Sequence, residues 1–226
     1  MAMTFSIVAR CETTGMFGVA VSSSSPAVAA RCAFAAAGAG AVASQNITDP
    51  RLGIHALELL ARGVSAQEVV AVLRRSSAHL EYRQVLVVDG TGASAIHSGP
   101  KALGIWAEAR SENVACGGNL LANENIPQAM ADSFSASSGH LGDRLLIALR
   151  AALKAGGEAG PVRSAGMKLV REVDWPVADL RCDWSEGCPI EDLSKIWTIY
   201  KPQLDDYVTR ALDPSRAPSY GVPGDE

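Results

Sequence analysis

A threonine close to the start of the chain is the residue with the clearest chemical potential. Thr4 lies in MAMTFSIVAR, directly before an apolar run that predicts a β-strand over Phe5–Arg10. A threonine hydroxyl is a poor nucleophile at neutral pH unless a base lies beside it. An α-amine, whose unperturbed pKa is about 7.7–8.0, is such a base when the threonine is itself the first residue. Thr4 is therefore either an ordinary strand residue or a nucleophile that needs its own free amine.

The position at which the mature chain begins decides between these two interpretations. If translation starts at Met3, removal of methionine before a small residue leaves Thr4 as the first residue. If it starts at Met1, removal exposes Ala2, and the nitrogen of Thr4 stays in a peptide bond. We expect hydrolytic chemistry only in the first case.

An amide side chain at the end of another predicted strand is a candidate oxyanion donor. Asn119 follows Gly117 and Gly118, and glycine allows close approach of a backbone N–H to a ligand. A side-chain amide supplies a second hydrogen bond to a developing oxyanion. The same GGN sequence also suits an ordinary turn.

Serines follow the second predicted strand. The run Phe17–Ser22 forms a hairpin with the first strand through the turn at Gly15, which places Ser22 and Ser23 beside Thr4. A hydroxyl there could contact the threonine amine, or it could simply solvate the strand edge. Serines occupy positions 22–25, so we expect no acidic side chain in this region.

Two further residues are candidates for the site. Arg31 is the only charge in the apolar stretch Ala27–Ser44, and a buried arginine without a partner is costly. It is expected to face either the site near Thr4 or a carboxylate in a structural ion pair. Ser164 opens a later strand after GGEAGPVR, where it either closes the far side of a pocket or caps the strand.

Composition excludes several classes of function. The 226 residues carry a net charge of −4 without a basic stripe, which argues against nucleic-acid binding. The most apolar stretch is made of small residues and is interrupted by Arg31, so no membrane span is predicted. No secretory signal is evident, and five irregularly spaced cysteines indicate reduced thiols in a cytoplasmic protein. No metal or cofactor motif is present.

Strands and helices alternate in blocks along the chain. Asp49 before Pro50 predicts the start of one helix, and the capping box of Ser65 and Glu68 predicts the start of the next. The predicted strands are Phe5–Arg10, Phe17–Ser22, Gly38–Gln45, Arg83–Gly90, Ala93–Gly99, Ile105–Arg110, Val114–Cys116, Ser164–Glu172 and Val177–Asp183. The predicted helices cover Pro50–Gly63, Ser65–Leu73, Asn125–Met130 and Leu141–Ala155, with a last helix that begins at Pro189 and runs through Ile199.

Many of the strands are apolar on both faces, as in VLVV and GVAV. This pattern is typical of sheets that pack on a second sheet inside and on helices outside. We therefore expect an α+β fold, a four-layer αββα sandwich of two antiparallel sheets. It forms one domain over residues 1–212, followed by an extended tail rich in Pro and Gly over residues 213–226.

Several longer motifs resemble a known family. TFSIVAR, GVAVSSSSPAVAARCAFAAAGAGAVASQN, CGGNLL, GGEAGPVRSAG, WPVADLRCDW and YGVPGD are similar to the bacterial and archaeal family of unknown function numbered 1028, whose members are described as related to the Ntn hydrolases. The resemblance covers nearly the whole chain. It implies the Ntn-hydrolase-like αββα fold of amidohydrolases that use an N-terminal Thr, Ser or Cys, here Thr4, and it implies that a basic residue such as Arg31 tunes the nucleophile.

Two functions follow as expectations. The first is hydrolysis of a small amide or other C–N bond by Thr4, with a small-molecule substrate and no cofactor. The alternative is a protein that binds a small ligand and keeps the fold without the chemistry. A homodimer or higher homo-oligomer, with the last helix and its Trp197 and Tyr200 as a subunit contact, is compatible with both, although a buried core position also suits these aromatic residues.

Overall fold

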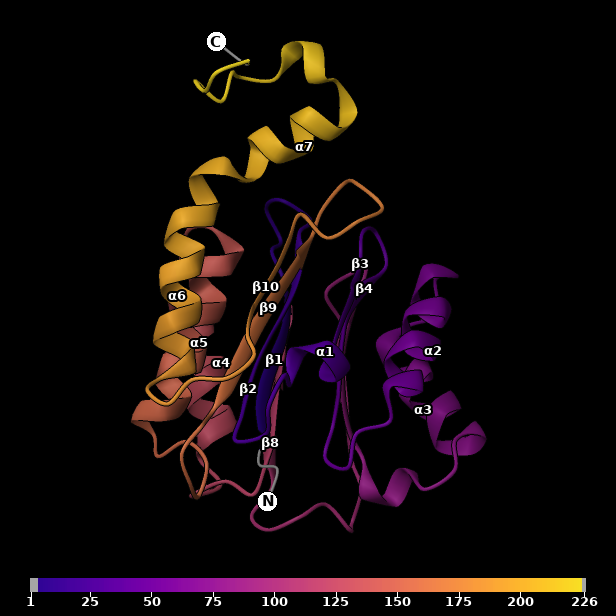
Figure 1. Cartoon of the computed structure of the whole chain (residues 1–226). Coiled ribbons are helices and arrows are strands. Elements are labelled where there is room, and N and C mark those ends of the chain that lie inside the picture. Colours follow the sequence, from indigo (N-terminus) through magenta and orange to yellow (C-terminus); the bar gives the residue numbers. More distant parts are fainter. Residues whose placement is uncertain (1–3, 225–226) are drawn as a thin grey trace.

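Two antiparallel β-sheets face each other, and helices cover the outer side of each sheet (Figure 1). The computed structural model describes residues 4–224 of the chain. Helices α4, α5 and α6 pack on the larger sheet, whereas α2 and α3 pack on the smaller one. The predicted four-layer αββα sandwich of two antiparallel sheets is therefore confirmed.

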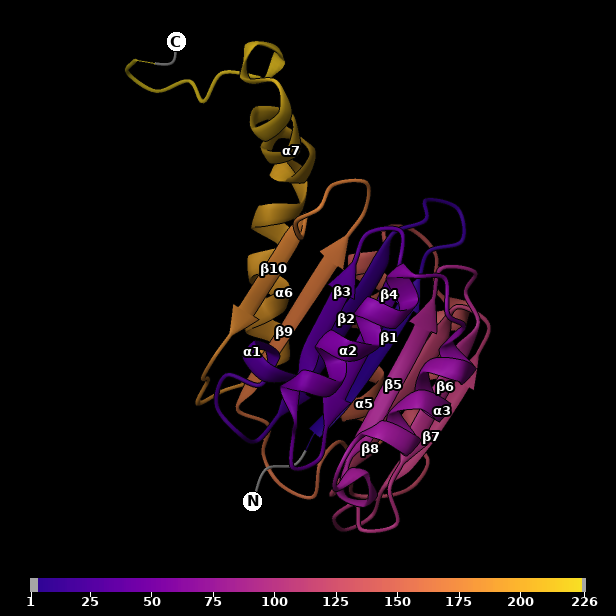
Figure 2. The ribbon, with the colours of Figure 1, turned by 90° about the vertical axis from the view of Figure 1, so that its right-hand side faces the viewer.

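The larger sheet has six strands in the order β10-β9-β2-β1-β8-β7, and the smaller sheet has four in the order β3-β4-β5-β6. Figure 2 shows both sheets from the side covered by α2 and α3. The strands of the larger sheet are β1 (Thr4–Arg10), β2 (Phe17–Ser23), β7 (Ala107–Ser111), β8 (Val114–Asn119), β9 (Ser164–Val170) and β10 (Ala178–Cys182). Those of the smaller sheet are β3 (Ala33–Ala36), β4 (Gly40–Gln45), β5 (Gln84–Asp89) and β6 (Ser94–Ser98).

Most of the helices begin at the signals found in the sequence. Asp49 accepts a hydrogen bond from the backbone of Arg51 before α2, and Ser65 and Glu68 form the predicted capping box before α3. The helices are α1 (Ala29–Cys32), α2 (Pro50–Ala61), α3 (Ala66–Ser76), α4 (Ile126–Ala136), α5 (Leu141–Lys154), α6 (Pro189–Tyr200) and α7 (Leu204–Leu212). Three short 3₁₀ turns cover Leu80–Tyr82, Lys201–Gln203 and Pro214–Arg216.

Three apolar layers separate the four structural layers. One lies between the larger sheet and α4–α6 and includes Phe5 and Ile7 of β1. The middle one lies between the sheets and includes Val8 of the same strand. The third lies between the smaller sheet and α2–α3. Because successive side chains of a strand point to opposite faces, β1 contributes to two layers at once.

The structure differs from the sequence-based elements in a few places. The stretch before β4 forms the short helix α1 and strand β3, where no element was predicted. Helix α4 continues to Ala136, beyond the predicted end at Met130, because Ala131 and Phe134 extend its apolar face into the core. A further helix, α7, follows α6 and extends away from the sandwich (Figure 1).

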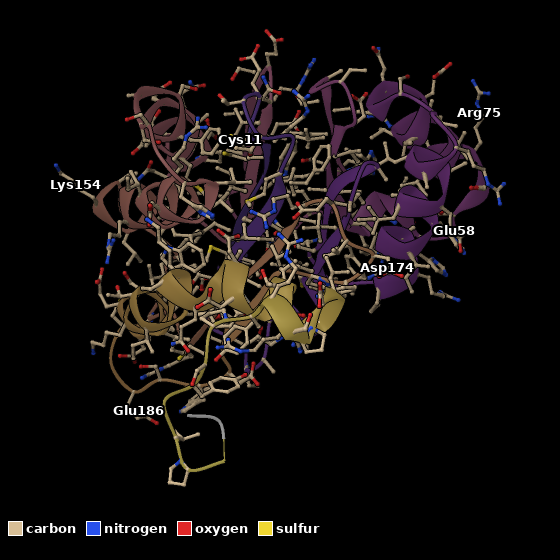
Figure 3. The ribbon with its side chains drawn as sticks, turned by 90° about the horizontal axis from the view of Figure 1, so that it is seen from above. Cys11, Glu58, Arg75, Lys154, Asp174 and Glu186 are labelled. Carbon is tan, nitrogen blue, oxygen red and sulfur yellow. The ribbon has the colours of Figure 1, made fainter. Side chains whose placement is uncertain are left out.

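Charged side chains of the outer helices lie on both outer sides of the molecule. Lys154 at the end of α5 and the pair Glu58 and Arg75 on α2 and α3 lie on opposite outer sides of the molecule (Figure 3). Over residues 4–224, no helix is long and apolar enough to cross a membrane.

Candidate functional site

Four of the predicted site residues lie in one row across the larger sheet. Thr4 is directly opposite Ser23 on one side and Asn119 on the other, and Ser23 is in turn opposite Ser164. Directly opposed residues of antiparallel strands share one face of the sheet. Thr4 shares its face with Ser6, whose hydroxyl bonds to the smaller sheet. The row therefore faces the space between the two sheets, at the end where β1 begins.

A chain of hydrogen-bonded hydroxyls leads from Thr4 to a charge. Thr4 Oγ1 lies 3.2 Å from Ser23 Oγ, and Ser23 Oγ lies 2.8 Å from Ser25 Oγ. Arg31 Nη2 donates to Ser25 Oγ at 2.5 Å. Because a guanidinium only donates, the hydroxyl hydrogen of Ser25 is available to Ser23, and that of Ser23 is available to Thr4. This hydroxyl relay can favour negative charge on Thr4 Oγ1.

Arg31 binds carbonyl and hydroxyl oxygens, and not a carboxylate. It is half-buried, and its Nη1 donates to the carbonyl oxygens of Pro26 and Ala27 at 2.8 and 3.1 Å. Among residues 4–224 no carboxylate lies within ion-pair distance of it. The guanidinium thus holds the turn after β2 and reaches Thr4 through the hydroxyl relay.

Ser164 and Ser22 hold the backbone around the row. Ser164 Oγ donates to the carbonyl of Ser25 at 2.6 Å and accepts from the backbone N–H of Val28 at 3.1 Å. Ser22 is opposite Phe5, on the other face of the sheet, and its hydroxyl donates to the carbonyl of Ser164 at 3.0 Å. The structure therefore places Ser164 in the row and Ser22 behind it.

Asn119 is buried opposite Thr4 without a hydrogen-bond partner. Its side chain is 0% exposed, and neither Oδ1 nor Nδ2 has a partner among residues 4–224. An unsatisfied buried amide costs about 1–3 kcal/mol, so natural proteins keep few of them. Gly118 lies opposite Phe5 on the far face, where an added Cβ would be 2.6 Å from Leu121 Cδ2. Of this pair, only Asn119 directs its side chain to the inner face.

Two glutamines that the sequence analysis missed complete the wall opposite the row. Ser6 Oγ donates to Gln45 Oε1 at 2.7 Å, and Gln45 Nε2 donates to Gln84 Oε1 at 2.6 Å. Gln84 Nε2 then donates to Ser98 Oγ at 2.9 Å. Both glutamines are fully buried at the ends of otherwise apolar strands, which was the available sequence signal. The end of the inter-sheet space near Thr4 is thus polar, whereas the rest is apolar.

Glu158 is another residue that the sequence analysis missed. Its side chain places a carboxyl group at the end of β2. Its Oε2 accepts a hydrogen bond from the backbone N–H of Ser24 at 3.0 Å, and its Oε1 has no partner among residues 4–224. Glu158 is 5% exposed. Burial raises the pKa of its carboxyl to about 8, against the lowering effect of hydrogen bonds from Ser24. The sequence signal was a single acidic residue within GGEAGPVRS.

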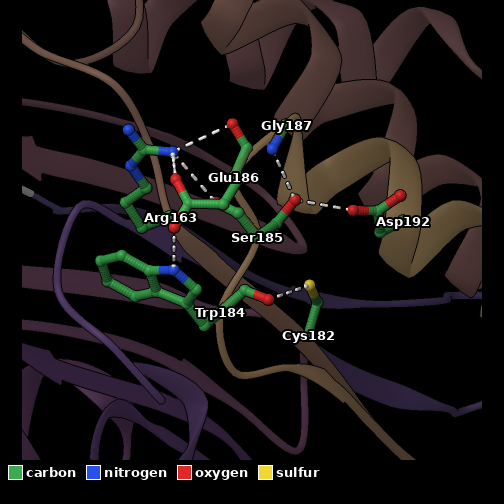
Figure 4. Close-up of polar contacts among 7 residues, drawn as sticks. All are labelled: Arg163, Cys182, Trp184, Ser185, Glu186, Gly187 and Asp192. Atoms are coloured by element: carbon green, nitrogen blue, oxygen red, sulfur yellow. Dashed lines mark hydrogen bonds and ion pairs between the residues drawn. The ribbon is translucent and has the colours of Figure 1, made fainter.

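A nearby cation is directed away from the row. Arg163 precedes Ser164, but its Nη1 pairs with Glu186 Oε2 at 3.0 Å and donates to two carbonyl oxygens of the loop after β10 (Figure 4). Trp184 Nε1 donates to the same carboxylate at 2.8 Å. Arg163 therefore anchors this loop, and Arg31 is the cation connected to Thr4.

The chemical groups of the row and its surroundings are hydroxyls, amides and the carboxyl of Glu158. Within residues 4–224 no group of three or more His, Cys, Asp or Glu side chains could hold a metal ion. All five cysteines are free thiols. Hydroxyl and amide groups suit acyl transfer, in which a hydroxyl attacks a carbonyl and an amide donates to the resulting oxyanion.

A family model and a solved structure of the same family match this chain. The crystal structure of protein SPO2555 from Silicibacter pomeroyi, assigned to the DUF1028 family model, has 28% sequence identity and a TM-score of 0.82 and covers 88% of this chain and 89% of its own. Anbu (ancestral beta-subunit) from Yersinia bercovieri has 10% identity and a TM-score of 0.39 over 90% of this chain and 97% of its own. No curated protein matches the sequence. The model of the family of unknown function DUF1028 matches residues 4–193, and the chain therefore belongs to this family.

Proposed function

We propose that the protein is an Ntn-type amidohydrolase that cleaves a small amide or other C–N bond with Thr4 as nucleophile. The observation that carries this proposal is the pairing of Thr4, at the head of β1, with the unpartnered amide of Asn119 directly opposite. The hydroxyl relay to Arg31 and the start of the family match at Thr4 support it.

The reaction follows from the positions of these groups. The free α-amine of Thr4 takes the hydroxyl proton as Oγ1 attacks the substrate carbonyl carbon, and the oxygen of that carbonyl becomes an oxyanion. Asn119 Nδ2 donates to the oxyanion. The C–N bond then breaks, the leaving nitrogen takes the proton, and an ester on Thr4 remains. Water hydrolyses this ester and restores the hydroxyl.

The alternative is a protein that binds a small ligand in the same polar space. The buried and unpartnered Asn119 favours it as well, since an amide recognises a bound ligand whether or not Thr4 has a free amine. The two functions differ in one requirement. Only hydrolysis needs Thr4 to be the first residue.

A covalent probe separates these functions without knowledge of the substrate. The chain is produced from Met3, and intact mass verifies that Thr4 is the first residue. It is then treated with an alkyl β-lactone, whose ring a threonine hydroxyl opens without releasing a leaving group. We expect one adduct with the full mass of the lactone, on the peptide that begins with Thr4.

Two matched proteins control this experiment. Neither Thr4→Ala nor the chain that retains residues 1–3 should form the adduct. Folding of both is checked by circular dichroism and thermal unfolding. Equal labelling of Thr4→Ala, or no labelling of the chain that begins with Thr4, would refute hydrolysis and leave ligand binding.

We also propose that the protein is a homo-oligomer, with the arm formed by α6 and α7 as the contact to a second copy. Trp197 is only 2% exposed and donates to Asp143, so it belongs to the core and not to the expected subunit contact. The most exposed apolar residues of the arm are Ile199 and Leu212, at 69% and 62% exposure. Sedimentation velocity should show a dimer or larger species that Ile199→Asp with Leu212→Asp converts to monomer. A monomeric wild-type protein would exclude the proposed homo-oligomer.

A further inference from the structure

The short segment 157–159 lies beside the chain that leaves β8. Leu121 and Glu158 form an isolated antiparallel bridge. The backbone N–H of Ala159 donates to the carbonyl of Leu120 at 3.1 Å. The backbone N–H of Ala122 donates to the carbonyl of Gly157 at 3.0 Å. Glu158 is therefore fixed by its backbone and not only by its side chain.

The segment 157–159 lies on the same edge of β8 as β1. On the other edge, the N–H groups of Leu120 and Leu121 donate to the carbonyls of residues 103 and 105, immediately before β7. In the sheet, β8 has β7 on one side and β1 on the other. Glu158 thus continues the line of β1 beyond its first residue. Thr4 is opposite Asn119 and Glu158 is opposite Leu121, two residues further along the chain that leaves β8.

The side chain of Glu158 connects this position to the strand on the other side of β1. Its Oε2 accepts from the N–H of Ser24, and Ser24 follows Ser23, which lies opposite Thr4. The ends of β2 and β8 therefore both hold Glu158 in front of the first residue of β1. Its remaining oxygen, Oε1, is buried and has no partner among residues 4–224.

We infer that Glu158 is the counter-ion of the Thr4 α-amine once Thr4 is the first residue of the chain. The ammonium group would lie in line with β1, on the side of Glu158, and would supply the partner that Oε1 lacks. Glu158 is then a positioning residue that orients the amine beside Oγ1. The inference rests on the proposed function, because it takes Thr4 as the mature first residue.

The pairing also couples the charge state of Glu158 to the removal of the residues before Thr4. A peptide nitrogen carries no charge, so the buried carboxyl stays protonated at neutral pH in the longer chain, as its raised pKa indicates. An ammonium group beside it favours the ionised form. The groups that face Glu158 are Ser24 after β2 and residues 120–122 after β8, all uncharged. Arg163, the first basic residue after Glu158 in the sequence, pairs with Glu186 instead.

The pKa of the Thr4 amine tests this arrangement without any substrate. In the chain that begins with Thr4, the rate of acetylation by acetic anhydride is measured against pH, with the N-terminal peptide quantified by mass spectrometry. We expect Glu158→Gln to lower the amine pKa by about one unit, a tenfold change in the ratio of charged to neutral amine. The control Glu12→Gln makes the same chemical change in the exposed turn between β1 and β2, and should leave the pKa unchanged. An unchanged pKa in Glu158→Gln overturns the inference.

A second measurement uses only unsubstituted sequence and so does not depend on folding of the variant. Urea unfolding is compared between pH 6 and pH 8 for the chain with residues 1–3 and for the chain that begins with Thr4. In the longer chain the unfolding equilibrium constant should rise by close to tenfold per pH unit from Glu158, while the shorter chain lacks this rise. Parallel profiles would contradict the pairing.

The test of the ion pair and the β-lactone test of hydrolysis can fail independently of each other. If Thr4 resists the β-lactone while its amine pKa depends on Glu158, hydrolysis fails and the ion pair stands. If the β-lactone labels Thr4 and Glu158→Gln leaves the amine pKa unchanged, the ion pair fails and hydrolysis stands.

Discussion

The hydroxyl of Thr4 lies 3.2 Å from the hydroxyl of Ser23, although the two residues are 19 positions apart in the sequence. The hairpin of β1 and β2 sets this distance, because its register places the two residues directly opposite each other. The contact is therefore set by the register of the hairpin.

Replacing Asn119 should lower turnover and leave the free energy of unfolding nearly unchanged. Asn119→Ala removes the proposed oxyanion donor, so we expect turnover by the chain that begins with Thr4 to fall by roughly 10²-fold or more. Because the buried amide has no partner in residues 4–224, its loss relieves an unsatisfied group and should offset most of the cost of the cavity. Urea unfolding measures the second effect. A large loss of stability with unchanged turnover would assign Asn119 a structural role.

Removing the charge at the end of the hydroxyl relay should slow the reaction without weakening substrate binding. Arg31→Ala leaves Ser25 without a charged donor, and we expect kcat to fall about tenfold with KM unchanged. Arg31→Lys should recover part of this loss, since it keeps the charge but not the fork of donors. The exposed Arg62→Ala serves as the matched control. A change confined to KM would argue against the relay.

The stability of the chain with residues 1–3 should depend on Glu158 in a pH window from about 4.5 to about 8. Across this window the folded state keeps the carboxyl protonated, whereas the unfolded state ionises it. Stability from this group is therefore fully present below pH 4.5 and is lost as pH rises, by up to about 1.4 kcal/mol per pH unit.

The variant Glu158→Gln cannot ionise and should lack this loss. The difference in unfolding free energy between variant and wild type should grow with pH and favour the variant at pH 8. Taking this difference cancels the contributions of the other titratable groups. Chemical denaturation at four or five pH values would show it, and a difference that is independent of pH would contradict the assignment.

The buried glutamines should contribute to stability as one network. Gln45→Leu leaves the Ser6 hydroxyl and Gln84 Oε1 without their present partners, and we expect a loss of about 2–4 kcal/mol. The double variant with Gln84→Leu should lose less than the sum of the two single changes. Gln128→Leu, on the exposed side of α4, is the control. Additive effects would show that the two glutamines act independently.

Most of the fold could be predicted because its signals are local. The strands VLVV and GVAV are apolar on both faces, and only a layer on each side can bury them. The capping residues before α2 and α3 act within three residues of the helix start. Helix α7 was missed although it buries Leu204 and Val208 on one face, because Pro202 interrupts the helical pattern between it and α6.

The candidate site was also predicted only in part from the sequence. By itself, the sequence determined that a threonine precedes the first strand, that serines follow the second, and that the hairpin between them is short enough to bring these residues together. Only the tertiary structure decided that Glu158 reaches Ser24 across 134 positions and that Gln45 meets Ser6 across 39. Local periodicity reports which face a residue occupies, but contacts between distant segments depend on strand order and on the packing of one sheet against the other.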